Sequence, residues 1–206
     1  MPTIYQLKPA FQNLLRPLTQ RLFRLGVTAN HVTLAAMLFS CVVGALLYGF
    51  PTARWALFLI PLFLFLRMAL NAIDGMLARE HQQKSALGAV LNELGDVVSD
   101  AALYLPFAIL PGMEPALLVL IVLLAVISEM TGVVAIQIGA ARRYDGPMGK
   151  SDRAFIFGAV ALALALGAPP GAWQNWVFGA VALLLLLTIF NRGRGALQEI
   201  KPRNRS

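Results

Sequence analysis

Long apolar stretches, separated by short polar segments, run along most of the chain. A helix needs about 20 mostly apolar residues to cross a bilayer, and most of the stretches approach that length. We expect spans near residues 30–50, 53–78, 85–110, 115–140, 153–166 and 172–190. Pro51 follows the first stretch and Pro111-Gly112 follows the third, as helix-ending residues do. The pattern therefore predicts an all-α integral membrane protein with six transmembrane helices.

The segment before the first span has the spacing of an amphipathic helix. Its apolar residues recur every three or four positions: Leu7, Phe11, Leu14, Leu18, Leu22 and Leu25. Its cations lie largely off that stripe: Lys8, Arg16, Arg21 and Arg24. A helix of this kind lies in the head-group plane of an anionic leaflet. We therefore expect an N-terminal amphipathic interfacial helix in addition to the six spans.

The composition agrees with a protein whose main solvent is a bilayer. Hydrophobic residues make up 58% of the chain and charged residues 13%, whereas a soluble domain has about 25% charged residues. The formal net charge is nevertheless +7, which favours anionic lipid head groups or phosphorylated substrates as partners. Because apolar stretches separate the basic residues, we do not expect nucleic acid as a partner.

Lysine and arginine lie almost entirely on one side of the predicted spans. They occur in the N-terminal segment, in the connections after the second and fourth spans, and in the C-terminal tail. The positive-inside rule places that side in the cytoplasm, so we expect an inner-membrane protein with both termini and its active site at the cytoplasmic face. The predicted domains are an interfacial segment (1–27), a six-helix membrane domain (28–192) and a basic cytoplasmic tail (193–206), which we expect to be disordered.

Polar residues gather at the facing ends of the second and third predicted spans. Residues three or four apart share one face of a helix, so Arg67, Asn71 and Asp74 line one face of the second span. One face of the third span carries a similar row: Gly88, Asn92, Asp96 and Asp100. The short connection makes these helices antiparallel neighbours. We therefore expect both rows to line one cavity at the membrane edge.

Carboxylates at membrane depth are costly unless a cation or water compensates their charge. An oxygen ligand set without histidine or thiolate suits Mg²⁺ or Mn²⁺ rather than zinc. We predict a metal site with these ligands: Asp74, Asp96, Asn71, Asn92 and Asp100. Gly75 and Gly88 have no side chain, so a nucleotide could approach the backbone there. The alternative is that these polar residues only hold the helices together.

The spacing of these residues resembles that of the CDP-alcohol phosphotransferase (CDP-alcohol phosphatidyltransferase) family. The family pattern is D-x2-D-G-x2-A-R-x8-G-x3-D-x3-D. This chain matches it at the following positions: Asp74-Gly75, Ala78-Arg79, Gly88 and Asp96. The resemblance extends to six spans, an interfacial helix and Thr28-Ala29-Asn30 at the start of the first span, and so covers most of the chain.

The resemblance implies a reaction and a set of roles. Two Mg²⁺ or Mn²⁺ ions would be held by the aspartates, and a cytidine diphosphate site would lie beside Gly75, Ala78, Arg79 and Gly88. Asp96 would be the general base that deprotonates an acceptor hydroxyl, which attacks the β-phosphorus while CMP leaves. The donor would be a CDP-activated lipid such as CDP-diacylglycerol, the acceptor a small alcohol, the pathway phospholipid synthesis and the assembly a homodimer.

Two positions depart from the family pattern. Its first and third aspartates are Asn71 and Asn92 here, and each change removes one negative charge. Glu93 and Asp100 lie close enough in the sequence to compensate. Either the metals are held differently, or one metal is lost, or the activity has drifted. Two alternatives therefore stay open, a non-catalytic relative that binds CDP-lipid and a hydrolase that uses water in place of the alcohol.

Basic residues near this constellation are candidate ligands for a substrate phosphate. They lie in the second span and in or beside the long polar loop before the fifth span: Arg67, Arg142, Arg143, Lys150 and Arg153. For the residues in and beside the loop, the alternative is the ordinary cytoplasmic excess of positive charge. For Arg67, the alternative is an ion pair with Glu129, which lies at moderate depth in the fourth span.

Overall fold

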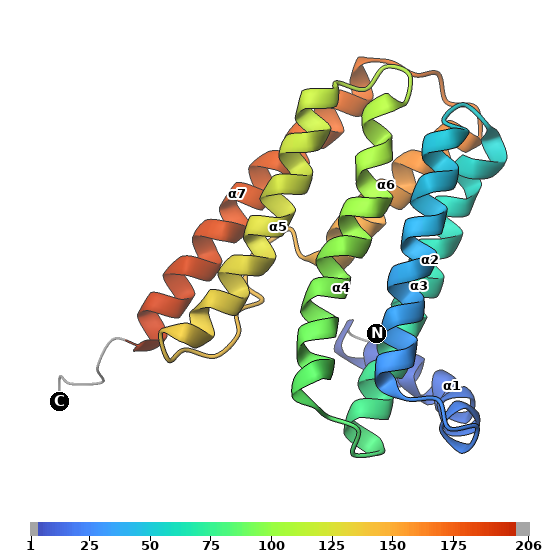
Figure 1. Cartoon of the computed structure of the whole chain (residues 1–206). Helices are drawn as coiled ribbons and strands as arrows, with labels where there is room; N and C mark the ends of the chain where they lie inside the picture. Colours follow the sequence, from blue (N-terminus) through green and yellow to red (C-terminus); the bar gives the residue numbers. More distant parts are fainter. Residues whose placement is uncertain (1–3, 201–206) are drawn as a thin grey trace.

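The computed structural model describes residues 4–200, and side chains from residue 9 onward. Over this range the chain forms a bundle of α-helices and one short 3-10 helix (Figure 1). Their bounds are α1 Ile4–Arg24, α2 Ala29–Gly49, α3 Arg54–Glu80, α4 Ala86–Tyr104, η1 Leu105–Ile109, α5 Pro115–Gln137, α6 Lys150–Ala165 and α7 Ala172–Ile200. The predicted all-helical class is confirmed, and the helices follow one another in the predicted order.

The apolar helices mark the protein as an integral membrane protein. Among the described residues, four helices are long and apolar enough to cross a membrane, namely α2, α3, α5 and α7. Helix α4 with η1 takes the place of the third predicted span, and α6, with 16 residues, takes the place of the fifth. Helix α4 carries three carboxylates, and α6 is short. A count of six spans therefore stays a prediction.

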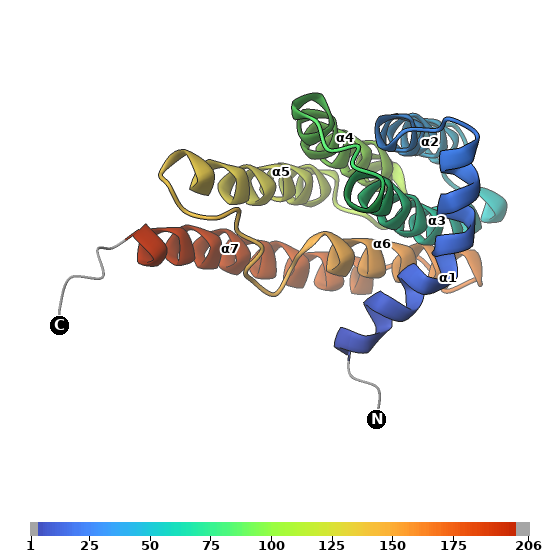
Figure 2. The ribbon, with the colours of Figure 1, turned by 90° about the horizontal axis from the view of Figure 1, so that it is seen from below.

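Helix α1 lies across the end of the bundle and contacts α3 (Figure 2). The rings of Phe11 and Phe65 meet edge-on, with centroids 6.2 Å apart, and Leu22 packs on the apolar cluster shared by α2 and α3. Leu14, and Leu25 directly after the helix, are 75% and 78% exposed. Helix α1 thus offers apolar side chains both to the protein and to its surroundings, as an interfacial helix does. The side chains of Leu7 and Lys8 lie outside the described part.

Helix α7 continues beyond the predicted start of the tail and ends at Ile200. Arg192 is 2% exposed, and its Nη1 donates a hydrogen bond to the backbone oxygen of Ser128 at 2.6 Å. Ala196 packs with Ala135 at the end of α5. The prediction of a disordered tail is therefore wrong for residues 193–200, because small side chains let α7 pack closely there. Residues 201–206 lie outside the described part.

The position of α4 is set by close packing on both sides. A Cβ atom on Gly44 would collide with the backbone oxygen of Ala102, so the missing side chain allows α2 and α4 to touch. At the far end of α4, Tyr104 stacks on Phe157 of α6 with ring centroids 3.9 Å apart, and Phe107 meets the same ring at 4.9 Å. With α4 held in this position, its carboxylates reach Arg67 of α3 and the cations Lys150 and Arg153 of α6.

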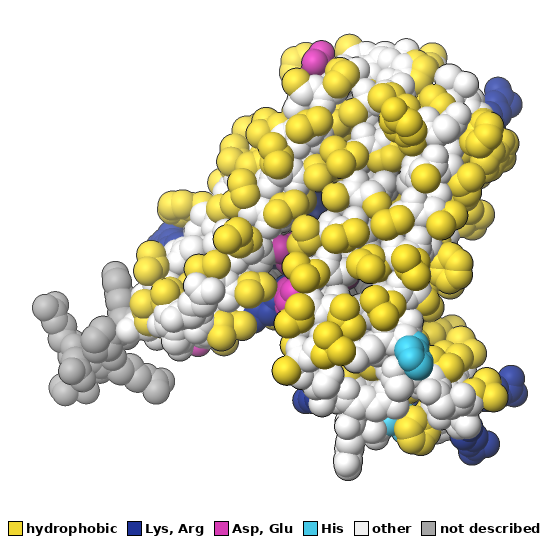
Figure 3. All heavy atoms as spheres, in the orientation of Figure 1, with side chains coloured by type: hydrophobic (Ala, Val, Ile, Leu, Met, Phe, Trp, Pro, Cys, Tyr) yellow, Lys and Arg dark blue, Asp and Glu magenta, His cyan; other side chains and the backbone are white. Residues whose placement is uncertain are grey.

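Charged side chains come to the surface on one face of the molecule. Hydrophobic side chains cover most of this face, while acidic and basic atoms appear in a seam between α4 and α5 (Figure 3). In Figure 1 the pair of α5 and α7 diverges from α2 and α4 toward the end of the bundle at which α1 lies. The charged residues therefore lie between these two parts of the bundle.

Candidate active site

The beginning of α2 positions the carboxylate of Asp74. Thr28 caps the helix, and its hydroxyl oxygen accepts a hydrogen bond from the backbone N–H of His31 at 3.2 Å. One turn later, the Oγ1 of Thr33 donates to Oδ2 of Asp74 at 3.1 Å and also lies 3.0 Å from the backbone oxygen of Ala29. Asp74 is 7% exposed. Among the described residues, a hydroxyl rather than a cation is therefore its side-chain partner.

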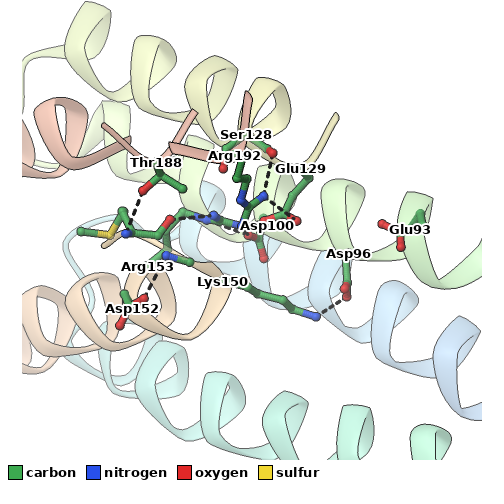
Figure 4. A network of polar contacts seen from close by, with 12 residues as sticks. Glu93, Asp96, Asp100, Ser128, Glu129, Lys150, Asp152, Arg153, Thr188 and Arg192 are labelled. Carbon is green, nitrogen blue, oxygen red and sulfur yellow. Dashed lines mark hydrogen bonds and ion pairs between the residues drawn. The ribbon is translucent and has the colours of Figure 1, made fainter. Parts of the chain in front are cut away.

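Asp96 of α4 contacts cations from two other helices, of which Lys150 is labelled in Figure 4. The Nζ of Lys150, at the start of α6, donates to its Oδ1. The Nη2 of Arg67, from α3, lies 3.6 Å from the same oxygen and donates to the backbone oxygen of Asp96 at 3.1 Å. Neither contact uses Oδ2. The side chain of Asp96 is 24% exposed, so one carboxylate oxygen stays available to a ligand.

Asp100 lies one turn further along α4 and is buried, with 5% of its surface exposed. The Nη1 of Arg67 donates to Oδ1 at 2.5 Å, and the Nη2 of Arg153 donates to Oδ2 at 2.8 Å. Because both oxygens are taken by guanidinium groups, we no longer include Asp100 among the metal ligands. The expected pair between Arg67 and Glu129 is also wrong, since Arg67 faces α4 and pairs with Asp100.

Glu129 of α5 joins three arginines from different parts of the chain, of which Arg153 and Arg192 are labelled in Figure 4. Arg153 contacts Oε1 at 3.0 Å, while Arg142 and Arg192 contact Oε2 at 3.4 and 3.3 Å. Arg142 also donates to Oε2 of Glu93 at 2.6 Å. Glu129 therefore ties the loop after α5 and the helices α6 and α7 to one point, and Glu93 is engaged by Arg142.

The loop over residues 138–149 is fastened to α7. Arg143 donates to Oδ2 of Asp145 and to Oε2 of Glu199, each at 2.7 Å. The hydrogen bonds from Arg143 hold the pKa of the Asp145 carboxyl below its usual range. The Nε of Arg192 donates to the backbone oxygen of Asp145 at 3.3 Å. Arg143 therefore has a structural role on the α7 side of the loop.

The residues predicted to lie beside a nucleotide contact other side chains of the protein. A Cβ atom on Gly75 would lie 3.1 Å from Nη1 of Arg79, so this guanidinium folds over the glycine. A Cβ atom on Gly88 would lie 2.8 Å from Oδ1 of Asn30, where α2 and α4 approach each other. Ala78 packs on the cluster that receives α1. Gly88 and Ala78 thus lie at contacts between helices, whereas Gly75 lies under a side chain of its own helix, and the role of these residues toward a nucleotide stays a prediction.

A cavity of about 650 Å³ lies between α3 and α6. Its polar lining is Arg67, Asn71, Lys150 and Ser151, and the rest is apolar. Phe65 and Phe155 line the apolar part and are 61% and 76% exposed, so the cavity reaches the apolar outer surface. Lys150 thus stands between Asp96 and an apolar groove.

The structure assembles the predicted metal ligands only in part. Asn71 is half-buried and lines the cavity, whereas Asn92 is exposed on α4, one turn before Asp96. Within residues 4–200, three or more histidine, cysteine, aspartate or glutamate side chains do not come together as a metal-binding group. Two carboxylates, Asp74 and Asp96, remain as candidate ligands, with the amide oxygens beside them.

Thr33 and Arg192 are site residues that the sequence reasoning missed. Thr33 lies three positions after Asn30, which places both on one face of α2, and this spacing was the available signal. Arg192 is the last residue of the predicted membrane domain, and no site role was expected for it because the apolar run ends before it. Its burial against Ser128 and Glu129 depends on how α5 and α7 pack, which local sequence does not encode.

The chain has a relative among known inner-membrane proteins. The inner membrane protein YnbA of Escherichia coli (strain K12) is 50% identical to it over 196 residues, which cover 95% of this chain and 96% of YnbA. Two structures of the phosphatidylinositol phosphate synthase PgsA1 of Mycobacterium tuberculosis, one with CDP-DAG bound and one with manganese and citrate, share the fold. Each covers 92% of this chain at a TM-score of 0.76 and 19% identity, spanning 96% and 92% of the PgsA1 chains.

The likeness to PgsA1 supports the fold, and the family follows from sequence. The family model described as CDP-alcohol phosphatidyltransferase matches residues 26–189. This range includes α2 to α6 and most of α7, and it holds Asp74, Asp96 and the residues around them. The chain therefore belongs to the CDP-alcohol phosphatidyltransferase family, whose reaction is the transfer of a phosphatidyl-type group from a CDP-alcohol in phospholipid synthesis.

Proposed function

We propose that the chain transfers the phosphatidyl group of a CDP-activated lipid, such as CDP-diacylglycerol, to a small acceptor alcohol and releases CMP. The observation that carries this proposal is the cavity between α3 and α6, which joins an apolar groove to a polar end beside Asp96. A CDP-lipid has the same division, with acyl chains at one end and a charged diphosphate at the other. The PgsA1 structure with CDP-DAG bound supports this choice of donor.

The oxygen donors at the polar end suit a hard divalent cation. Asp74 has no cationic partner among the described side chains, and Asn71 shares its helix face one turn earlier. We propose that Asp74 and Asn71 serve Mg²⁺ or Mn²⁺, with Asp96 and Asn92 of α4 as the further candidate ligands. The PgsA1 structure in complex with manganese supports such an ion. When bound, the ion would neutralise charge on the diphosphate of the donor.

Asp96 is the proposed general base. Lys150 and Arg67 approach its Oδ1, which leaves Oδ2 to accept the proton of an acceptor hydroxyl. The hydroxyl oxygen then forms a bond to the phosphorus that carries the lipid. The bond between that phosphorus and the bridging oxygen of the diphosphate breaks, and CMP leaves with the electron pair. A short-lived covalent enzyme intermediate is not needed for this displacement.

Lys150 is the basic residue best placed to hold a substrate phosphate. It lines the cavity and makes one ion pair, with Asp96, whereas Arg67, which also lines the cavity, is engaged by both Asp100 and Asp96. Arg153 is 1% exposed, so we no longer propose it as a phosphate ligand. The two loop arginines, Arg142 and Arg143, are held in ion pairs with carboxylates of α4, α5, α7 and the loop itself.

The orientation of the protein in the membrane and its assembly are also part of the proposal. We propose that the site and both termini face the cytoplasm. The connections richest in lysine and arginine lie at the same end of the bundle as the site, and such connections are typically cytoplasmic. A homodimer and a small acceptor alcohol follow from the family resemblance alone. Membrane lipids would surround the exposed apolar side chains of the spanning helices.

A second candidate function is supported by a specific observation. Asn71 and Asn92 stand where the family pattern has aspartates, and Lys150 contacts the proposed base. A relative that binds CDP-lipid without transferring its phosphatidyl group, or that hydrolyses it, would keep the cavity and tolerate these changes. The complete match at Asp74-Gly75, Ala78-Arg79, Gly88 and Asp96 favours transfer.

The lipid groove can be tested by filling it. Ala159 is exposed on α6 and lines the apolar part of the cavity. Ala159→Phe should raise the KM for long-chain CDP-diacylglycerol by about 10-fold or more, because it occupies space needed by an acyl chain. Ala45→Phe, at an exposed position on α2 outside the cavity, is the matched control. Equal KM values for the two variants would contradict the assignment of the groove to the lipid.

A further inference from the structure

The charged residues around the site are nearly balanced before any ion is added. Four carboxylates take part in the interhelical ion pairs of this region: Glu93, Asp96, Asp100 and Glu129. Five cations face them: Arg67, Arg142, Lys150, Arg153 and Arg192. With the carboxylate of Asp74, the number of negative charges equals the number of positive charges. Two divalent cations would therefore add four positive charges to a group that is already neutral, and one would add two.

The two candidate metal ligands have different partners. Asp74 accepts a hydrogen bond from the Thr33 hydroxyl and makes no ion pair with a described side chain. Asp96 is contacted by the ammonium of Lys150 and lies 3.6 Å from a guanidinium nitrogen of Arg67. A dication that bound to Asp96 would be repelled by both cations. The charge that attracts a metal ion is therefore concentrated at Asp74.

The two asparagines add to the difference in charge between the surroundings of Asp74 and those of Asp96. Asn71 lines the cavity one turn before Asp74, so its amide oxygen can join that carboxylate as a neutral ligand. Asn92, on the face of Asp96, is also neutral and supplies no charge to offset Lys150. Around Asp96, one carboxylate and one amide thus face an ammonium group and a guanidinium group.

We propose that the site holds one divalent cation, bound by Asp74 with Asn71, and that the ammonium of Lys150 takes the place of a second cation at Asp96. This inference rests on the proposed metal-dependent transfer and specifies the number of ions. Lys150 comes from α6, so the positive charge next to Asp96 is supplied by the chain itself. Its position at the polar end of the cavity also brings it next to the diphosphate of a bound donor.

The number of bound ions is measured directly by titrating Mn²⁺ into the purified full-length protein and counting free Mn²⁺ by electron paramagnetic resonance. One bound Mn²⁺ per chain is expected for the wild type and for Lys150→Arg, which keeps the charge. Lys150→Gln should bind a second Mn²⁺, and Lys150→Gln combined with Asn92→Asp should bind it more tightly. Lys84→Gln, in the connection between α3 and α4, is the matched control and should behave as wild type.

Two results would overturn the inference. Two Mn²⁺ ions in the wild type, or none, would exclude a single-cation site. A count that stays at one in both variants carrying Lys150→Gln would show that the ammonium does not exclude a second ion. Because the ions are counted without turnover, these outcomes are separate from the proposed transfer, which fails if CMP is not released from CDP-diacylglycerol. Size-exclusion profiles identify any variant that fails to fold. Lys150→Arg changes the same side chain but keeps its positive charge, so a second ion that binds to Lys150→Gln and not to Lys150→Arg is attributed to the lost charge.

Discussion

The hydroxyl of Thr33 donates a hydrogen bond to Oδ2 of Asp74 at 3.1 Å, from the first turns of α2 to the last turns of α3. This contact fixes the carboxylate that we regard as the principal metal ligand. It also links the motif of α3 to the capped start of α2, where Asn30 packs beside Gly88 of α4. The start of α2 therefore lies against both α3 and α4, and small changes in α2 should affect the proposed metal site.

Thr33→Val removes this hydrogen bond while it keeps the shape of the side chain. Loss of a residue that orients a metal ligand typically costs about 10–100-fold in metal affinity, and we expect a loss of that size for Mn²⁺. Thr33→Ser retains the hydroxyl and should bind Mn²⁺ as the wild type does. An unchanged affinity in Thr33→Val, with an unchanged melting temperature, would mean that Asp74 is positioned without Thr33.

Asp100→Asn should act on stability rather than on chemistry. The carboxylate is buried between Arg67 and Arg153, and breaking a buried ion pair on one side costs about 3–5 kcal/mol. We expect a marked fall in the thermal unfolding temperature in detergent. Glu80→Gln, which breaks an exposed pair with Arg16, is the control and should leave that temperature unchanged. If Asp100→Asn were as stable as the control, the interhelical role of Asp100 would have to be abandoned.

Much of the fold follows from local features of the sequence. Helix ends such as those at Gly49 and Gln137 lie within a few residues of the predicted bounds, because hydropathy and helix-ending residues act locally. The shared faces of Asn71 and Asp74, and of Asn92 and Asp96, follow from helical periodicity. The family pattern then gave the reaction class, which the family match confirms.

The partners of the charged residues could not be predicted in the same way. The sequence offered Glu129 as a partner for Arg67, and the actual pair with Asp100 depends on how α3 is rotated against α4 and α5. The extension of α7 has a similar origin, since Ala196 and the buried Arg192 contribute through tertiary packing rather than through hydropathy. Periodicity places residues on a face, and packing decides what that face meets.

Restoring the two aspartates of the family pattern should lower activity. Asn71→Asp with Asn92→Asp adds two negative charges near Asp74 and Asp96, which increases like-charge repulsion and changes the balance that Lys150 provides. We expect tighter Mn²⁺ binding and slower turnover on the native substrate in the double variant. The single variants separate the contribution of each position. Clearly faster turnover in the double variant would indicate that the asparagines are degenerate ligands and not an adaptation of this site.

The central claim is the transfer of a phosphatidyl group, and CMP release from radiolabelled CDP-diacylglycerol tests it most directly. The purified protein is supplied with Mg²⁺ and a panel of acceptors that includes glycerol 3-phosphate, an inositol phosphate and serine. We predict acceptor-dependent release that is abolished by EDTA and reduced about 10²–10⁴-fold by Asp96→Asn, as expected for loss of a general base. Release without any acceptor would indicate a hydrolase, and absence of release under every condition would contradict the account and favour a binding protein.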